Sequence, residues 1–340
     1  MSLRNSQKHK KRPTSHDVAD LARVSRATVS AYLNKTRYVS PELSERIEQA
    51  IKELNYTPDP LARALKVEDT KTIGLIIPVL SQFYTPMMRA INDLAHENGY
   101  GFLVSSSEEN ADTERDLLQI MAAKRISGLL LAPCSEENRD LLDDLQQNGT
   151  PIVQVNRKIT GLNVDSVVSD NYKAAYTATQ HLIERGRGHI VFLGYDPTTL
   201  SNAEKKEGYD AALHDYDLDE NLALIVKEHN PEKILEAFRE FLSSGQPFDG
   251  LICTTQGKTA IALSLLKEHN LRIPQDVAVV AFDDTVWSPF LCAPLTAISE
   301  QTYQMGVEAT QLLLERIGST EEAPPKHIIL ESKFIIRHST

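Results

Sequence analysis

The chain has 340 residues, of which 41% are hydrophobic and 24% are charged, and its formal net charge is −11. It has no run of the roughly 18 apolar residues that a membrane helix needs, and no apolar core follows its basic N-terminus, so we expect neither a membrane span nor a secretory signal. The three widely spaced cysteines, Cys134, Cys253 and Cys292, are predicted to be buried apolar groups in a reducing cytoplasm.

Positive charge is concentrated in the first 71 residues, which hold 14 Lys and Arg against 9 Asp and Glu. Their net charge is +5, so the other 269 residues carry −16. A basic tail over residues 1–12 contributes Arg4, Lys8, Lys10, Lys11 and Arg12. This asymmetry predicts a basic head on an acidic body, with phosphate attracted to one end only.

The pattern over residues 13–58 predicts three short helices around one small core. The first helix begins at Thr14 in a T-x-x-D capping pattern, and the second follows a tight turn at residues 23–25. The third has Ser40 as its N-cap and Pro41 at its first position. The first two helices and their turn are predicted to bury Val18, Leu21, Ala22, Val24, Val29 and Leu33. This arrangement is a helix-turn-helix module.

The face of the second helix opposite this core is predicted to read DNA in the major groove. The residues that we expect at the DNA are Thr14, Arg26, Ala27, Thr28, Ser30, Ala31 and Asn34. A solvated polar face on an ordinary three-helix bundle is the alternative, but the local positive charge favours DNA.

Residues 59–71 are predicted to be a hinge. Pro58 and Pro60 end the third helix, and the apolar residues around Leu61 and Leu65 allow one or two further helical turns. So short a helix is marginal in water, and we expect it to fold only when something packs on it. An inert linker is the alternative.

From residue 72 onward, apolar runs of strand length alternate with amphipathic helical stretches. The runs include Ile73–Pro78, Phe102–Ser105, Gly128–Pro133, Pro151–Val155, Ile190–Gly194, Leu251–Thr254 and Val277–Phe282. The helical stretches include Met87–Asn98, Asp112–Lys124, Asn171–Arg185, Ile234–Leu242 and Thr259–Asn270. This alternation predicts an α/β fold with parallel sheets covered on both faces. The length favours two lobes, with a ligand cleft at the carboxyl ends of the strands.

Six segments carry a more specific signal. They are DVADLARVSRATVSAYLN, SPELSERIEQAIKELNYTPDPLARAL, TIGLIIPVLSQFY, HLIERGRGHIVFLG, IPQDVAVVAFDD and PLTAI. Together they resemble the lactose/galactose repressor (LacI/GalR) family of bacterial transcriptional regulators, over the chain from Pro13 to His338. The resemblance implies a helix-turn-helix head, a hinge helix, and a two-lobed body like a type I periplasmic sugar-binding protein.

The resemblance also implies how the chain is divided and assembled. Lobe one comprises residues 72–168 and 299–326, and lobe two comprises residues 169–298 and 327–340. Dimerisation through the body places two heads on a pseudo-palindromic operator. Leu65 matches a leucine that wedges between base pairs in the minor groove, and Leu61, Ala62 and Lys66 are expected at the DNA beside it.

One departure from the family affects the reading helix. Ala31 stands where an arginine commonly reads guanine, and its methyl can touch a thymine methyl but cannot make the bidentate contact. Arg26 could supply a guanine contact instead. We therefore expect the operator to differ from the family consensus.

By resemblance, several residues at strand ends contact the effector. Tyr84 matches an aromatic that stacks on an effector ring, and Arg157 matches an arginine that binds polar ligand oxygens. Asp170 and Asp283 match acidic residues that accept hydrogen bonds from hydroxyls. Each of these residues alone could be a helix cap or a surface group, but together they predict a sugar-like ligand. Trp287, the only tryptophan, either borders the cleft or covers a hydrophobic gap.

Three departures change the charge expected in the cleft. Lys205 replaces an arginine, Thr255 and Gln256 replace an Asn-Asp pair, and Asn156 replaces an acidic residue. Together with Arg157, these changes leave fewer carboxylates. A sugar acid or a sugar phosphate therefore competes with a neutral sugar as the predicted effector.

Three classes of function were compared. The first is an effector-controlled transcription factor, the second is a transport-type sugar receptor without DNA function, and the third is an enzyme. The basic head opposes the second, and no nucleotide-binding, nucleophile or metal-ligand motif supports the third, so we expect no catalysis, cofactor or metal. The sequence predicts a homodimeric regulator of a carbohydrate-utilisation operon. Repression is the expected mode of control. We place it in the bacterial cytoplasm, associated with the nucleoid, with control by a partner protein as an alternative.

Overall fold

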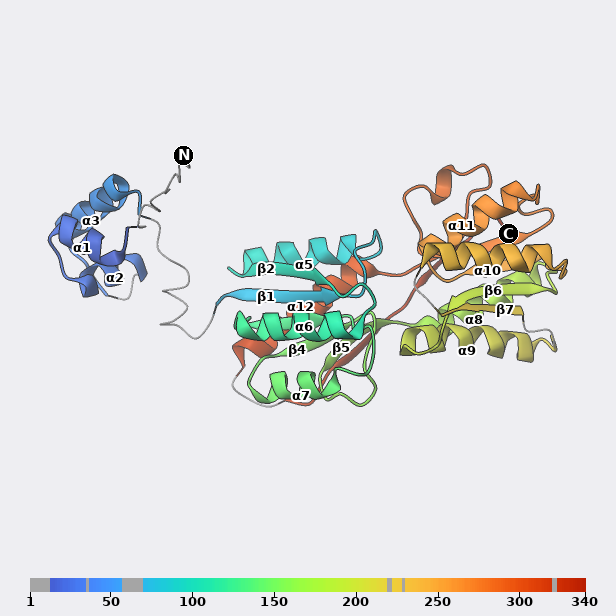
Figure 1. The fold of residues 1–340 in the computed structure, drawn as a ribbon, viewed down its shortest axis with the longest axis horizontal. Helices are drawn as coiled ribbons and strands as arrows, with labels where there is room; N and C mark the ends of the chain where they lie inside the picture. Colours follow the sequence, from blue (N-terminus) through green and yellow to red (C-terminus); the bar gives the residue numbers. More distant parts are fainter. Residues whose placement is uncertain (1–12, 35–36, 57–69, 219–221, 228–229, 320–322) are drawn as a thin grey trace, which may run out of the picture. The chain divides into compact units, whose positions relative to one another are not determined.

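Figure 1 shows a computed structural model of the chain, which describes residues 13–34, 37–56, 70–218, 222–227, 230–319 and 323–340. The chain divides into two compact units, Met1–Thr70 and Lys71–Thr340. The predicted basic tail, and the hinge residues Leu61, Ala62, Leu65 and Lys66, lie outside the described residues. Within the described ranges, no helix is both long enough and apolar enough to cross a bilayer.

The first unit contains the three predicted helices, α1 (Ser15–Ala22), α2 (Arg26–Asn34) and α3 (Pro41–Leu54). The capping box at the start of α1 is confirmed: the Thr14 backbone N–H donates to Asp17 Oδ2 at 2.7 Å, and the Asp17 backbone N–H donates to Thr14 Oγ1 at 3.4 Å. Ser40 Oγ caps α3 by accepting a hydrogen bond from the Leu43 backbone N–H at 3.4 Å. Polar side chains therefore satisfy the free N–H groups that begin both helices.

Of the six residues predicted for the core of this unit, Val18, Ala22 and Val29 are buried, Val24 and Leu33 are partly buried against them, and Leu21 is not part of it. The buried members of the core are Val18, Ala19, Ala22, Val29, Ile47 and Ala50. Leu21 was predicted to belong to it but is 43% exposed. The buried stripe of α1 is centred between Val18 and Ala19, which places Leu21 roughly 100° away around the helix.

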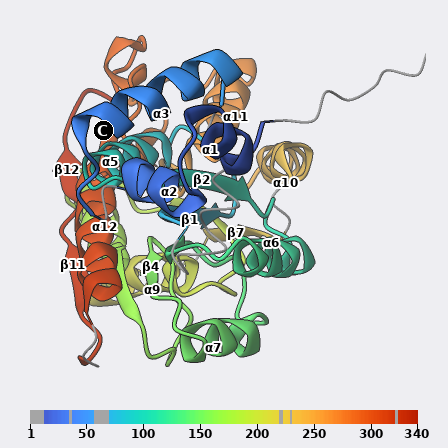
Figure 2. The same cartoon turned by 90° about the vertical axis from the view of Figure 1, so that its left-hand side faces the viewer.

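The second unit begins with a six-stranded parallel sheet in the order β11-β5-β4-β3-β1-β2. Its strands are β1 (Thr72–Ile77), β2 (Gly101–Ser106), β3 (Gly128–Leu131), β4 (Ile152–Val155), β5 (Asp165–Ser169) and β11 (His327–Leu330). One face packs on α5 (Thr85–Glu97) and α12 (Thr302–Gly318), which lie side by side (Figure 2). The other face packs on α6 (Ala111–Ala123) and α7 (Arg139–Gln147).

A second six-stranded sheet has the order β12-β10-β9-β8-β6-β7 and is parallel except for β12, which runs antiparallel to β10. Its strands are β6 (Ile190–Tyr195), β7 (Leu222–Val226), β8 (Gly250–Cys253), β9 (Ala278–Phe282), β10 (Thr296–Ser299) and β12 (Lys333–Ile335). Helices α8 (Asn171–Glu184) and α9 (Leu200–Asp215) cover one face. Helices α10 (Pro231–Ser243) and α11 (Gln256–Glu268) cover the other, and a short 3-10 helix, η1 (Ser288–Phe290), follows β9.

The α/β class with two parallel-rich sheets is confirmed, but one predicted lobe boundary was wrong. Residues 327–330 were expected in lobe two. As β11 they pair in parallel with residues 166–169 of β5 and complete the first sheet. The chain returns to the second sheet only at β12, which pairs with β10. The third crossing between the lobes therefore falls between Leu330 and Lys333.

Helices α8 and α9 approach closely at Gly208. A Cβ there would overlap the backbone carbonyl oxygen of Tyr172 and lie 3.0 Å from the Tyr176 backbone nitrogen. Both atoms belong to the backbone of α8, so neither can move aside independently. The absent side chain is thus a condition of this helix packing.

Gly208→Ala is expected to lower the free energy of unfolding by about 1–3 kcal/mol, because the added methyl overpacks a backbone contact. Thermal unfolding followed by circular dichroism measures the effect. Gly318→Ala is the matched control, since a Cβ at Gly318, the last residue of α12, meets nothing within 4 Å. Equal unfolding temperatures for the two variants would show that the helices do not depend on this contact.

Candidate DNA-reading surface and effector site

Helix α2 begins at a serine cap that the sequence interpretation treated only as part of a turn. Ser25 Oγ accepts a hydrogen bond from the Thr28 backbone N–H at 3.1 Å and lies 2.8 Å from Thr28 Oγ1. The S-x-x-T spacing was the signal for this cap. Thr28, a predicted DNA contact, therefore already has a partner within the protein.

The exposed part of α2 is narrower than the predicted reading face. Arg26 and Ala27 are exposed, and Thr28 and Ser30 are half-buried. Ala31 is only 3% exposed, so the prediction that its methyl is presented to a base was wrong. Helix α2 is buried both at Val29 and at Ala31, which lies on a different side of the helix. The apolar spacing predicted burial only on the side of Val29. The side chain of Asn34 lies outside the described residues.

A long-range contact fixes the helix that precedes the reading helix. The Arg46 guanidinium on α3 donates to the carbonyl oxygens of Ala22 at 2.6 Å and Arg23 at 3.1 Å. These carbonyls end α1, where orphan acceptors and the helix dipole favour a cation. Arg46 thereby holds the turn that leads into α2. Thr14 is exposed at the opposite end of α1, where its hydroxyl is 2.7 Å from Asp17.

In the second unit, the predicted effector residues of lobe one follow the carboxyl ends of β1 and β4. Tyr84 is 3% exposed and is part of the lobe-one core, with its hydroxyl accepting a hydrogen bond from Asn156 Nδ2 at 2.9 Å. Burial raises the pKa of Tyr84 to about 12. The ring is thus packed inside the lobe, which contradicts the expected open stacking face. Asn156 has a φ of 61°, in the left-handed region that asparagine tolerates.

Arg157 is paired with a carboxylate that the sequence interpretation missed. Its Nη1 and Nη2 donate to the two oxygens of Glu109 at 2.7 and 2.8 Å, and the side chains are 12% and 10% exposed. Burial alone would lower the pKa of Arg157, but the hydrogen bonds and charge of Glu109 raise it above its usual value. Glu109 follows β2, at the same edge of the sheet as Arg157.

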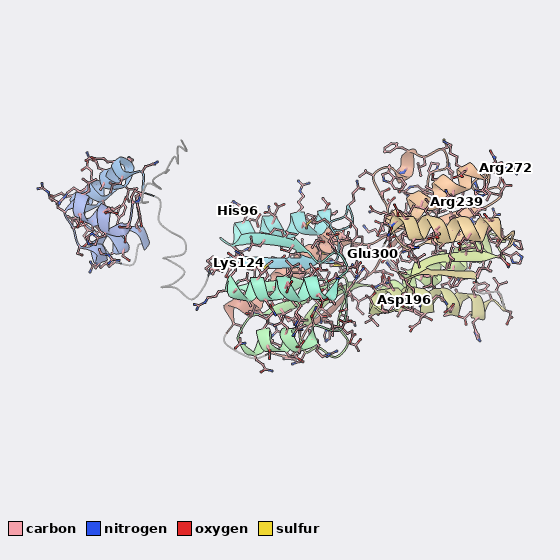
Figure 3. The ribbon with its side chains drawn as sticks, viewed as in Figure 1. His96, Lys124, Asp196, Arg239, Arg272 and Glu300 are labelled. Atoms are coloured by element: carbon pink, nitrogen blue, oxygen red, sulfur yellow. The ribbon has the colours of Figure 1, made fainter. Side chains whose placement is uncertain are left out.

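A second unpredicted carboxylate, Glu300, lies on the crossing segment after β10 (Figure 3). Its Oε1 accepts from Lys205 Nζ at 3.1 Å, and its Oε2 accepts from Ser169 Oγ at 2.9 Å. Lys205 Nζ also lies 4.5 Å from the centroid of the Phe282 ring. This one carboxylate therefore ties together two crossing segments and α9.

Asp283 comes next to this group at the end of β9, with a φ of 73°. Burial raises its pKa from the ordinary 3.8 to about 7, and the negative charge of Glu300 acts in the same direction. Lys205 and a hydrogen bond from the Gln256 backbone oppose the rise. Asp283 is therefore held close to its protonated form, in which it can donate as well as accept.

The other predicted effector residues have structural partners. Asp170 Oδ1 accepts from the Ser332 backbone N–H at 2.8 Å and so joins two crossing segments. Thr255 caps α11, and Gln256 is half-buried as the first residue of that helix. Trp287 is partly buried against the core beneath α10 and α11, which favours its gap-covering alternative.

Lys258, which the sequence interpretation did not select, is fully buried in the first turn of α11. Its Nζ has no hydrogen-bond partner in the described part of the chain and lies 2.7 Å from the centroid of the Tyr195 ring. Burial lowers the pKa of Lys258 well below its ordinary 10.5. A lysine near the start of a polar helix turn is normally solvated, and no sequence signal marked this one.

The strand ends of the two lobes are close enough to share one electrostatic environment. The charges of Glu109 and Arg157, on lobe one, act on Tyr195 and Lys258, on lobe two. The sequence predicted that Arg157 and Lys205 lie in a cleft with few carboxylates. This was wrong for both residues, because each is paired with a carboxylate.

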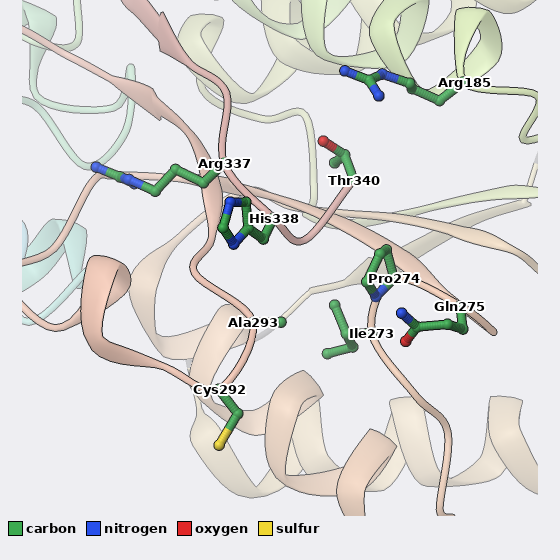
Figure 4. Close-up of a pocket in the computed structure, with 9 residues that line it drawn as sticks. All are labelled: Arg185, Ile273, Pro274, Gln275, Cys292, Ala293, Arg337, His338 and Thr340. Carbon is green, nitrogen blue, oxygen red and sulfur yellow. The ribbon is translucent and has the colours of Figure 1, made fainter.

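A separate cavity of about 540 Å³ lies elsewhere in the second unit (Figure 4). Its lining includes Arg185, Cys292 and His338 and none of the predicted effector residues. Cys292 is exposed, contrary to the prediction of burial, whereas Cys253 is buried. Among the residues that the structure describes, no cluster of His, Cys, Asp and Glu is arranged to hold a metal.

Comparison with known proteins gives a consistent result over most of the chain. The family model described as "Bacterial regulatory proteins, lacI family" matches residues 14–59. The model described as "Periplasmic binding proteins and sugar binding domain of LacI family" matches residues 70–338. The first range contains α1 to α3, and the second contains both sheets.

Individual relatives agree. The HTH-type transcriptional repressor PurR of Aliivibrio fischeri is 32% identical over 318 residues, covering 89% of this chain and 91% of the relative. A complex of the transcriptional regulator CelR with cellobiose has a TM-score of 0.72 at 28% identity, covering 97% of this chain and 100% of that one. The Lac repressor dimer bound to operator and the anti-inducer ONPF has a TM-score of 0.84 at 22% identity, covering 97% and 99%, and supports the fold alone. These relatives are regulators rather than enzymes.

The raised pKa of Asp283 predicts a pH-dependent loss of stability. Between pH 4 and 7 the folded chain retains a proton that the unfolded chain releases, so this carboxyl costs stability as the pH rises through that interval. Asp283→Asn mimics the protonated form and suits the left-handed backbone. It is expected to raise the unfolding temperature by about 2–4 °C at pH 8 and by less at pH 4. Parallel pH profiles for variant and parent in thermal unfolding would contradict this assignment.

Proposed function

Since the chain belongs to the LacI family of bacterial regulatory proteins and is a DNA-binding, ligand-responsive transcriptional repressor, we propose that it binds a pseudo-palindromic operator as a homodimer. We also propose that a small carbohydrate-like effector bound between its lobes controls that binding. The observation that carries the proposal is the presence, in one chain, of a head and a two-sheet body that match the two family models over residues 14–59 and 70–338.

In this proposal each segment has one task. Residues 1–12 and 13–58 bind DNA, residues 59–71 form the hinge, and residues 72–340 bind the effector and dimerise. The chain represses a carbohydrate-utilisation operon in the bacterial cytoplasm, on nucleoid DNA. It needs no cofactor, because repression requires only binding.

The head reads bases through the start of α2. Arg26 is exposed one residue after the Ser25 cap, so its guanidinium is free to enter a major groove and make the bidentate contact that guanine favours. Ala27, also exposed, contributes only shape complementarity to the DNA beside Arg26. Ser30 is half-buried, so at most part of its side chain contacts DNA. The proposed wedge at Leu65 rests on the family resemblance.

The effector binds at the facing strand ends. Its polar contacts are drawn from Asn156, Arg157, Asp170, Lys205, Thr255, Gln256 and Asp283. Tyr84 and Trp287 shape the site by packing rather than by stacking, because Tyr84 belongs to the core of lobe one and Trp287 packs against the core of lobe two. The similarity to a regulator bound to cellobiose supports a carbohydrate class of ligand.

Coupling runs through the segments that cross between the lobes. Glu300 binds Lys205 and Ser169, and Asp170 binds the Ser332 backbone, so a ligand that disturbs these contacts changes the angle between the lobes. A ligand with different affinity for two lobe arrangements shifts their populations, and the dimer transmits that shift to the paired heads.

The direct test is selection of duplexes from a random pool by the purified intact chain at low ionic strength. The proposal predicts enrichment of a two-fold-symmetric site. Its affinity should fall steeply with salt, because Lys and Arg contacts release counterions from phosphate. Enrichment of no sequence would refute DNA-directed function.

Arg26→Ala is expected to reduce affinity for the selected operator by about tenfold to a hundredfold, while affinity for random duplex stays nearly unchanged. The reason is that a base contact carries specificity whereas phosphate contacts do not. Fluorescence anisotropy with both duplexes provides the measurement, and Lys10→Ala, which should weaken both alike, is the comparison. Equal losses on both duplexes for Arg26→Ala would assign Arg26 to the phosphate backbone.

A further inference from the structure

The cations at the facing strand ends are not equivalent. Arg157 and Lys205 each have a carboxylate partner, Glu109 and Glu300 respectively. Lys258 has none within the residues that the structure describes, although it is the most completely buried of the three. A buried polar nitrogen without a hydrogen bond is destabilising, and such groups are rare in folded proteins.

The position of Lys258 directs it toward the effector site. It lies in the first turn of α11, which begins at the carboxyl end of β8, and the Thr255 hydroxyl caps that turn by accepting from the Lys258 backbone N–H at 3.4 Å. Its ammonium lies over the ring of Tyr195, the last residue of the neighbouring strand β6. The helix N-terminus adds a partial positive charge at the same place.

We propose that Lys258 is the receptor for a negatively charged oxygen group on the effector, a phosphate or a carboxylate. The inference rests on the proposed function, in which the effector binds between the lobes, and it names the chemical class of that effector. An oxyanion supplies the hydrogen-bond acceptor and the opposite charge that Lys258 lacks. A neutral sugar supplies hydroxyls as acceptors but no negative charge, so it would not favour the protonated form of this amine over the neutral form.

Groups of both charge signs, from several elements, face Lys258. They are Cys253 and Tyr195 from β8 and β6, Lys205 from α9, Glu109 and Arg157 from lobe one, and Asp283 after β9. Since Glu109 is already paired with Arg157, it is not a dedicated partner for Lys258. Burial lowers the pKa of Lys258 well below its ordinary value, so a bound oxyanion should draw a proton onto the amine.

Isothermal titration calorimetry of the intact chain tests the inference with three probes, glucose 6-phosphate, gluconate and glucose. The expected result is binding of glucose 6-phosphate or gluconate, with glucose weaker by tenfold or more. The first two probes separate phosphate from carboxylate as the recognised group. Repeating the titration in two buffers of different ionisation enthalpy should reveal proton uptake by the protein.

Two variants assign the effect to one residue. Lys258→Met keeps the length and apolar stem, and it is expected to weaken binding of the charged probe by about tenfold to a hundredfold and to abolish proton uptake. Its unfolding temperature should equal or exceed that of the parent, because a buried unpaired amine is removed. Lys267→Met, near the other end of α11, is the control and should bind like the parent. Proton uptake by the unaltered chain tests the inference independently of how the variant folds.

Three results would overturn the inference: binding of the charged probe by Lys258→Met with parental affinity, binding of glucose as tight as that of the charged probes, or no binding of either charged probe. Operator binding is measured separately. If glucose binds as tightly as the charged probes and changes operator affinity, the proposed function is supported and the assignment of Lys258 as an anion receptor is wrong. If no duplex sequence is preferred, the proposed function falls whatever the probes do.

Discussion

Parallel strands end together at one edge of a sheet, and this constraint determines where the chemistry of the chain lies. Polar residues that follow β1, β2 and β4 collect at one edge of lobe one, and those that follow β6, β8 and β9 collect at one edge of lobe two. Groups gathered and buried in this way must be paired, because an isolated charge away from water is costly. Arg157 with Glu109 and Lys205 with Glu300 meet that requirement, and Lys258 does not.

The paired charges also explain how a binding site can be coupled to a movement. Glu300 is almost fully buried on a segment that crosses between the lobes, and it is held by groups from the end of β5 and from α9. Breaking one of these bonds leaves a buried charge without its partner, so the arrangement favours discrete states over gradual deformation. A ligand that competes for Lys205 or Asp283 therefore changes which of these discrete states is favoured. In the proposed function, operator binding by the head responds to the arrangement of the lobes.

The sequence predicted the features that depend on local chemistry or on periodicity. The capping box at Thr14, the buried Val18 and Val29, and the alternation of strands and helices follow from neighbouring residues, and the structure agrees. The pairing of Arg157 with Glu109 joins residues 48 positions apart, and no local pattern marks it. Ala31 was misjudged, and Lys258 was not selected, for a related reason. Their burial is set by tertiary packing, which overrides the usual exposure of a small helix residue and of a lysine. Residues 327–330 were assigned to the wrong lobe because their alternating exposed and half-buried pattern does not indicate which sheet they join, and their pairing with β5 is made with residues far away in the sequence.

The proposed function requires effector binding and operator binding to be thermodynamically coupled. The most direct test is whether each ligand changes the affinity for the other by the same factor. Calorimetry with the probe that binds gives the effector affinity of the intact chain in the presence and absence of saturating operator duplex, and anisotropy gives the operator affinity with and without that probe. Linkage requires the two ratios to be equal, and we expect a common factor of about 5 to 150. Effector affinity that is the same with and without operator would show that the head and the body are merely joined and not coupled.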